Sequence, residues 1–334
     1  IEPGDYLPAF EQGMKEQMAE IDQITASTEP ATFENTIQAL EVSGQLLSKV
    51  SSVFYNLNSS LTSDTMQALA RTLSPLMSKH NDDIALNAAL FARIKTVYDQ
   101  RNELGLNGEE TMLLEKTYKR FVRGGALLNA QEQDKLRKIN EELSILSLSF
   151  GENVLAETNN FKLFITDSSQ LAGLPSSLRS ASAEAAAKEG KQGQWLFTLH
   201  SPSIFPFLQF ADDRSLREQM FKAYSNRGNH DDERDNKNII ARTAQLRYEL
   251  AKLLGYASHA DFILEQNMAS NPQIVRDFLT GLMKPAVAKA RKEAAALQEM
   301  IHQEGKNFKL EAWDWWYYTE KLRKARYDLD EEQM

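Results

Sequence analysis

Apolar side chains recur at helical spacing along most of the chain. One such run has steps of three, four or seven residues and predicts one face of a long helix: Phe33, Ile37, Leu40, Leu47, Val50, Phe54 and Leu57. Thr32 directly precedes this run and is the expected N-cap. The same spacing from Leu136 to Phe150 predicts a second long helix, and Asn129 and Glu132 stand before it at the spacing of a capping box.

Further helices are expected on both sides of these runs. The predicted ranges are 8–24, 63–79, 83–100, 108–122, 212–227, 233–254, 258–266 and 272–304. The Gly124-Gly125 pair after Arg123 is a helix-stop signal for the fourth of them. Pro285 lies inside the last range, where a proline should bend or split the helix.

Two short stretches follow a strand pattern instead. They are "NFKLFITD", from Asn160, and "QWLFTLH", from Gln194, in which alternate residues are apolar. We therefore predict a mainly α protein, a lobe of long antiparallel helices with a small two-stranded β insertion. The predicted parts are a long-helix region at 1–158, the β/α insertion at 159–204, and a second helical region at 205–334.

The composition excludes several classes of protein. A formal net charge of -9 argues against a nucleic-acid partner, because phosphate contacts need a basic face. No apolar run reaches the ~18 residues of a membrane-spanning helix, and the start of the chain has no signal-peptide pattern. Because the chain begins with Ile1 and not Met, we expect that it has been trimmed at the front. The absence of cysteine excludes disulfides and thiolate metal sites.

Candidate metal and catalytic groups are sparse. No two of the five histidines stand three to five residues apart, so the H-E-x-x-H zinc motif is absent. Glu299 and His302 form a lone Glu-x-x-His pair, which is most simply a solvated helix face. No G-x-S-x-G nucleophile context and no phosphate-binding glycine loop occurs. We therefore predict no catalytic and no metal-binding residue in this chain.

Several arginines are spaced along the expected helix 212–227. Arg214, Arg217 and Arg227 share this helix with Tyr224, and such arginines could bind a peptide carboxylate. The simpler interpretation, which we favour, is ion pairing within the same helix to Asp213 and Glu218.

The segment "WDWWYY", Trp313 to Tyr318, has five aromatic residues among six. At ~100° per residue they point in nearly every direction around a helix, and a helix that is apolar all round is covered by other protein. Two sources of that cover remain open: the preceding helices of this chain, or further polypeptide beyond Met334.

Five blocks of sequence, in order, resemble the front portion of thimet-oligopeptidase-type (neurolysin-like) zinc metallopeptidases. They are "GDYLPAFEQGM", "LAGLP", "RSLREQMFKAYSNRG", "LAKLLGYASHADFILEQNMA" and "WDWWYYTEKLRKARYDLDEEQM". Within that family the chain is most similar to bacterial peptidyl-dipeptidases, with oligopeptidase A next. The resemblance runs from about Asp5 to Met334, and both ends of the chain look cut by comparison with the family.

The resemblance implies a mostly helical, two-lobed enzyme with a deep channel that admits short unfolded peptides. It also implies zinc on an H-E-x-x-H helix, with a zinc-polarised water attacking the peptide carbonyl. Those zinc and oxyanion residues would lie past the point that matches Met334, so none is carried over here. Zinc is expected in the complete protein and not in this chain.

We accordingly expect a non-catalytic front lobe that walls the channel of a peptidase releasing C-terminal dipeptides. Its candidate channel-wall or lobe-junction residues are Trp313, Asp314, Trp316, Tyr317 and Tyr318. The expected partners are short peptides and a separate catalytic domain, with neither nucleic acid nor membrane. The alternative is a stand-alone helical module that binds peptides or proteins without catalysis. The cytoplasm is the expected compartment, or the periplasm if a signal peptide has been removed.

Overall fold

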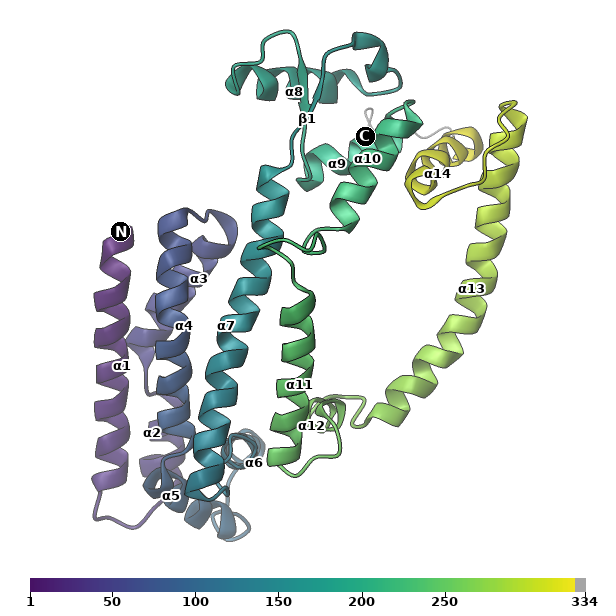
Figure 1. The fold of residues 1–334 in the computed structure, drawn as a ribbon. Helices are drawn as coiled ribbons and strands as arrows, with labels where there is room; N and C mark the ends of the chain where they lie inside the picture. Colours follow the sequence, from purple (N-terminus) through teal and green to yellow (C-terminus); the bar gives the residue numbers. More distant parts are fainter. Residues whose placement is uncertain (328–334) are drawn as a thin grey trace. The chain divides into compact units, whose positions relative to one another are not determined.

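A computed structural model describes residues 1–327 of this chain, and it is helical except for one small sheet (Figure 1). The predicted mainly α fold with a two-stranded insertion is confirmed. The chain forms two compact units, residues 1–149 with 239–263 and residues 150–238 with 264–334, the latter described as far as 327. The division into three domains, 1–158, 159–204 and 205–334, stays a prediction.

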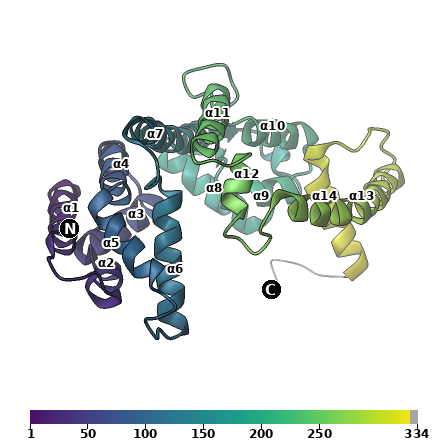
Figure 2. The ribbon, with the colours of Figure 1, turned by 90° about the horizontal axis from the view of Figure 1, so that it is seen from below.

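The first unit is built of helices alone among its described residues. Its elements are α1 (Pro3–Ala26), the π-helical η1 (Phe33–Gln38), α2 (Ala39–Glu41), α3 (Gln45–Ser60), α4 (Asp64–Ala85), α5 (Ala88–Asp99), α6 (Gly108–Arg123), the first part of α7 (Ala130–Asn160), most of α11 (Lys237–Leu253) and most of α12 (His259–Leu264). Figures 1 and 2 show α1, α3 and α4 side by side. Their facing apolar side chains, Phe10, Leu47, Phe54 and Leu73 among them, form one core of this unit.

The helix expected across residues 33–57 is interrupted, which corrects the prediction of one continuous helix. Gly44 has a left-handed backbone, with φ of 71°, and separates α2 from α3. Its backbone N–H donates to a Glu20 carboxylate oxygen at 2.7 Å. A Cβ atom at this position would lie 2.4 Å from the Gln17 side chain. The apolar spacing stayed in phase across the break, so periodicity alone could not reveal it.

The predicted helix-end signals are confirmed. The Thr32 hydroxyl accepts a hydrogen bond from the Asn35 N–H, and Asn129 and Glu132 form a reciprocal capping box before α7. Helix α6 ends at Arg123, after which the next two residues are glycines.

The second unit contains the sheet and the C-terminal helices. Its elements are the end of α7, β1 (Leu163–Ile165), the 3₁₀ helix η2 (Ser168–Leu171), α8 (Ser176–Lys188), β2 (Trp195–Phe197), α9 (Ser201–Phe210), α10 (Arg214–Ser225), α13 (Pro272–Gln303) and α14 (Ala312–Tyr327). The strands pair antiparallel with Leu163 opposite Phe197 and Ile165 opposite Trp195. Leu163, Ile165 and Phe197 join residues of α9 and α10 in one apolar core.

Helix α13 runs unbroken through Pro285, and Figure 1 draws it as a bowed helix. The proline therefore does not split the helix. Within the described residues, no helix is long and apolar enough to cross a membrane.

Candidate functional site

Asp314 lies at the centre of the contacts between α14 and α10. Its carboxylate is fully buried and accepts hydrogen bonds from Arg214 (Nη2, 2.8 Å) and Arg217 (Nη2, 3.0 Å). Arg217 is itself 1% exposed, whereas the Arg214 side chain is 32% exposed. The prediction that these arginines pair within their own helix is therefore wrong. Their acid partner comes from a helix about a hundred residues later in the chain.

The Arg217 guanidinium also ties α9 to this cluster. Its Nη1 donates to the carbonyl oxygens of Ala211 at 2.6 Å and Asp212 at 3.2 Å, directly after the end of α9. Its guanidinium carbon lies 4.0 Å from the centre of the Tyr317 ring. A charged group with this many partners is a structural tie, because a buried charge is tolerated only when it is paired and hydrogen-bonded.

Tyr317 and Tyr318 anchor the other sides of α14. The Tyr317 hydroxyl donates to Asp212 Oδ1 at 2.7 Å, and burial together with this carboxylate raises the tyrosine pKa. The Tyr318 hydroxyl donates to Glu304 Oε2 at 3.1 Å, and burial raises its pKa as well. Their side chains are 3% and 0% exposed. Neither phenol is available to outside molecules in the described structure.

Glu304, just after α13, receives two lysines. Lys306 donates to it at 2.8 Å and Lys321 at 2.6 Å. Burial alone would raise the pKa of this carboxyl, but the two hydrogen-bonded ammonium groups outweigh it and lower the pKa from 4.5 to about 2. The side chain of Glu304 is 26% exposed, so this ion-pair cluster lies near the surface.

The tryptophans of α14 are less enclosed. Trp316 stacks on Phe205 of α9 with ring centres 5.0 Å apart and is 40% exposed. Trp313 packs edge-on against Phe221, with the Lys222 ammonium 5.1 Å from its ring. The preceding helices α9, α10 and α13 therefore cover most of the aromatic segment. All five residues singled out from the sequence take part in these contacts of α14 with its neighbours, which we call the α14 cluster. Their role as channel wall or lobe junction stays a prediction.

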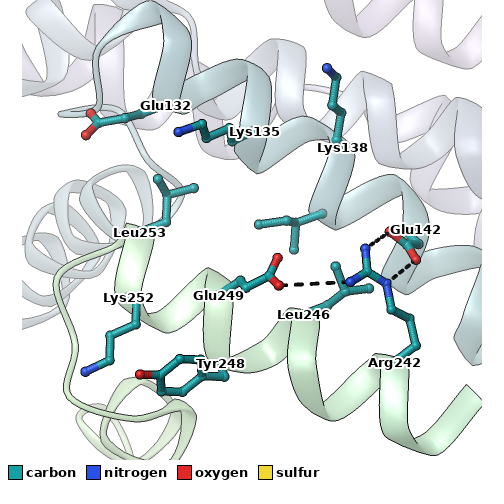
Figure 3. A pocket seen from close by; sticks show the side chains of 11 residues that line it. Glu132, Lys135, Lys138, Glu142, Arg242, Leu246, Tyr248, Glu249, Lys252 and Leu253 are labelled. Carbon is teal, nitrogen blue, oxygen red and sulfur yellow. Dashed lines mark hydrogen bonds and ion pairs between the residues drawn. The ribbon is translucent and has the colours of Figure 1, made fainter.

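A groove lies between α7 and α11 in the first unit (Figure 3). Its volume is about 610 Å³, within the range of small-ligand and peptide sites. The buried side chains of Ile139 and Leu246 line it. Figure 3 shows charged side chains from both helices around this apolar lining.

The rim of the groove carries both signs of charge. Arg242 forms a two-pronged pair with Glu142, at 2.6 and 2.7 Å, and this hydrogen bonding lowers the pKa of the glutamate. Lys135, Lys138 and Lys252 also line the groove, and no ion pair is found for them among residues 1–327. An apolar lining with unpaired ammonium groups suits a ligand that has both apolar and anionic parts.

The histidines gather into no metal-binding group in the described part of the chain. Across the described residues 1–327, no three His, Asp or Glu side chains gather in an arrangement that could hold a metal ion. His302 faces the Gln298 amide at 3.2 Å, and Glu299 accepts from Gln303. The described residues therefore offer no set of ligands for the zinc ion that the resemblance implies for a complete enzyme.

Sequence reasoning missed the Asp314 ion cluster and the groove. The first carried a usable signal: an aspartate among aromatic residues, on a helix apolar all round, must be buried and therefore paired. The groove had no signal in the sequence. Lys135 and Lys252 belong to helices far apart in sequence, and each looks like an ordinary solvent-exposed lysine.

Comparison with known proteins gives a consistent family. Residues 207–334 match the model of Peptidase family M3. The chain is 35% identical over 329 residues to dipeptidyl carboxypeptidase of Escherichia coli (strain K12), covering 98% of this chain and 48% of that protein. It is 32% identical over 339 residues to oligopeptidase A of Salmonella typhimurium, covering 100% of this chain and 50% of that protein.

A plant protein shows the same relation at lower identity. The organellar oligopeptidase A of Arabidopsis thaliana is 28% identical over 342 residues, which is 43% of its length. The chain spans about half the length of the curated relatives it matches. The family resemblance predicted from the sequence is confirmed.

Proposed function

Because residues 207–334 belong to peptidase family M3, we propose that this chain is the front lobe of a zinc metallopeptidase that cleaves short peptides. The carrying observation is that relatives called dipeptidyl carboxypeptidase and oligopeptidase A align along almost all of this chain yet are about twice as long. Release of C-terminal dipeptides is the specific activity we propose, since the relative at 35% identity bears that name.

In this proposal the chain forms part of the substrate channel and supplies no catalytic residue. Zinc, when bound by the complete enzyme, would activate the attacking water, and its ligands would come from the other half of the family's length. The helices described here would form a wall of the peptide channel, limiting access to short unfolded substrates. The α14 cluster supports a junction role, since Asp314, Arg217 and Tyr317 hold three helices in one fixed arrangement. We propose the cytoplasm as its compartment.

A chimaera tests the peptidase proposal. Residues 1–334 would be continued by the second half of the E. coli dipeptidyl carboxypeptidase, and dipeptide release from a short peptide would be followed by mass spectrometry. We expect chelator-sensitive release from the chimaera and none from the 334-residue chain. Chelator-sensitive hydrolysis by the 334-residue chain alone would contradict the division of roles.

The groove between α7 and α11 favours a second candidate function, a lobe that binds peptides without cutting them. Its apolar lining can take side chains, and Lys135, Lys138 and Lys252 can take carboxylates. Fluorescence anisotropy with a labelled acidic hexapeptide tests this on the 334-residue chain. Replacing Lys138 with Gln should weaken binding about threefold, as expected for one exposed charge contact. Lys49→Gln, outside the groove, is the control and should leave binding unchanged.

A further inference from the structure

The first two thirds of α13 exposes many large apolar side chains. Its large apolar side chains are 42–65% exposed, and we call them together the α13 apolar face: Ile274 (49%), Phe278 (65%), Leu279 (55%), Leu282 (50%), Met283 (61%) and Val287 (42%). The buried residues of α13 are Leu297 and Ile301, both in its last turns against α14. Within the described part of the second unit, most of this 32-residue helix therefore lacks a packing partner.

The spacing of these side chains makes one continuous surface. At ~100° per residue, the six positions cover more than half of the helix circumference. A helix with so wide an apolar face is normally covered by other protein, and an exposed apolar patch of this kind marks an interaction site. The segment of the chain that needs covering is thus α13, more than the aromatic segment of α14.

The helix is also basic, although the whole chain carries a net charge of -9. Arg276, Lys284, Arg291 and Lys292 have no ion pair among residues 1–327, whereas Lys289 pairs with Glu293. Cations around an apolar surface favour a partner that offers an apolar groove with an acidic rim.

We propose that the α13 apolar face is the docking surface for the other half of a family M3 peptidase, the polypeptide that would carry the zinc site. The inference rests on the proposed function. Helix α13 lies inside the segment 207–334 that matches the family, and the relatives have about as much chain again as the 334 residues seen here. That additional length supplies enough polypeptide to cover a face several helical turns long.

Two other occupants fit the charges less well. A second copy related by two-fold symmetry would bring two basic helices together, so the unpaired cations would repel one another. An anionic membrane would attract α13 but would repel a chain with a net charge of -9. Both remain as distinct outcomes of the experiment.

The absence of cysteine in this chain gives a direct test. Leu282→Cys places a single thiol on the α13 apolar face, and Lys284→Cys places one about 160° away on the same turn. Labelling rates with a maleimide dye would be measured in the 334-residue chain and in the chimaera with the second half of E. coli dipeptidyl carboxypeptidase. We expect the rate at position 282 to fall about tenfold or more in the chimaera, as for a thiol exposed only in rare openings, and the rate at 284 to change little.

Each outcome has a separate meaning. Equal labelling at 282 in both proteins overturns the docking proposal, even if the chimaera releases dipeptides. Protection at 282 in an inactive chimaera supports docking while counting against the peptidase function. Protection that depends on the concentration of the 334-residue chain indicates a second copy, and protection by phosphatidylglycerol vesicles indicates a membrane; either overturns the proposal.

A second variant covers the case in which the chimaera does not fold. Leu282→Glu in the 334-residue chain should leave its melting temperature within about 1 °C of the unsubstituted protein, because an exposed site loses no packing. A clear decrease would show that this chain itself covers the face, and would overturn the proposal.

Discussion

Replacing Asp314 with alanine should strongly destabilise the second unit. The carboxylate is fully buried and bonded to Arg214, to Arg217 and to the backbone N–H of Glu311. Its removal leaves the Arg217 guanidinium, 1% exposed, without its only carboxylate among the described residues. Arg214 can turn to water, because its side chain is 32% exposed, and so adds less to the loss.

The size of the effect follows from the cost of an uncompensated buried charge. Breaking a buried ion pair by removing one partner costs about 3–5 kcal/mol. For a unit of this size, each kcal/mol lowers the melting temperature by about 2–4 °C, so the expected decrease is on the order of 10 °C. Asp314→Asn keeps the shape and some hydrogen bonds and should cost less, about 1.5–3 kcal/mol.

Thermal unfolding followed by circular dichroism and by calorimetry measures this loss. Glu218→Ala is the matched control, because it removes the exposed pair with Lys222 on the same helix. That control should lie within about 1 kcal/mol of the unsubstituted protein. The double variant Arg217→Met with Asp314→Leu should recover part of the stability, since it removes both buried charges. If Asp314→Ala melted no lower than the Glu218→Ala control, the argument that α14 is held by buried charge pairing would be refuted.

Three further predictions concern other parts of the chain. Gly44→Ala should destabilise by about 1–2 kcal/mol through its left-handed backbone. A further loss is expected because the end of the Gln17 side chain, which hydrogen-bonds His80 at 2.7 Å, would have to move. Gly105→Ala is the control in urea unfolding, because its φ of 65° is similar but nothing lies within 4 Å of the added Cβ, so equal losses would refute the contact. The pKa of Glu304 is lowered from 4.5 to about 2, so its stabilisation is complete above pH 4.5 and is lost as the pH falls towards 2. Lys321→Gln should weaken this acid dependence of the melting temperature. An unchanged plot of melting temperature against pH would exclude the ion pair between Glu304 and Lys321 as its cause. Added zinc should not change the melting temperature of the 334-residue chain, whereas a saturable increase would show a metal site that binds the folded state.

The secondary structure was largely readable from the sequence because it depends on local spacing and on end signals. Thr32, Asn129 and the Gly124-Gly125 pair act within a few residues of themselves, and the structure shows them at helix ends. The family could also be recognised from the sequence, because the five blocks and their order can be compared with the family without knowing which blocks touch in the fold. The break at Gly44 escaped because the apolar positions on either side kept the same helical phase.

The sequence by itself determined that this is a helical chain with a small β insertion, that it resembles the front half of family M3 peptidases, and that no zinc motif lies within it. Only the tertiary structure decided which helices meet, because a contact such as that between Arg217 and Asp314 joins positions about a hundred residues apart. It also decided where the apolar surface is exposed: burial is a property of neighbours in space, so α14 is covered while α13, with an ordinary-looking pattern, is open.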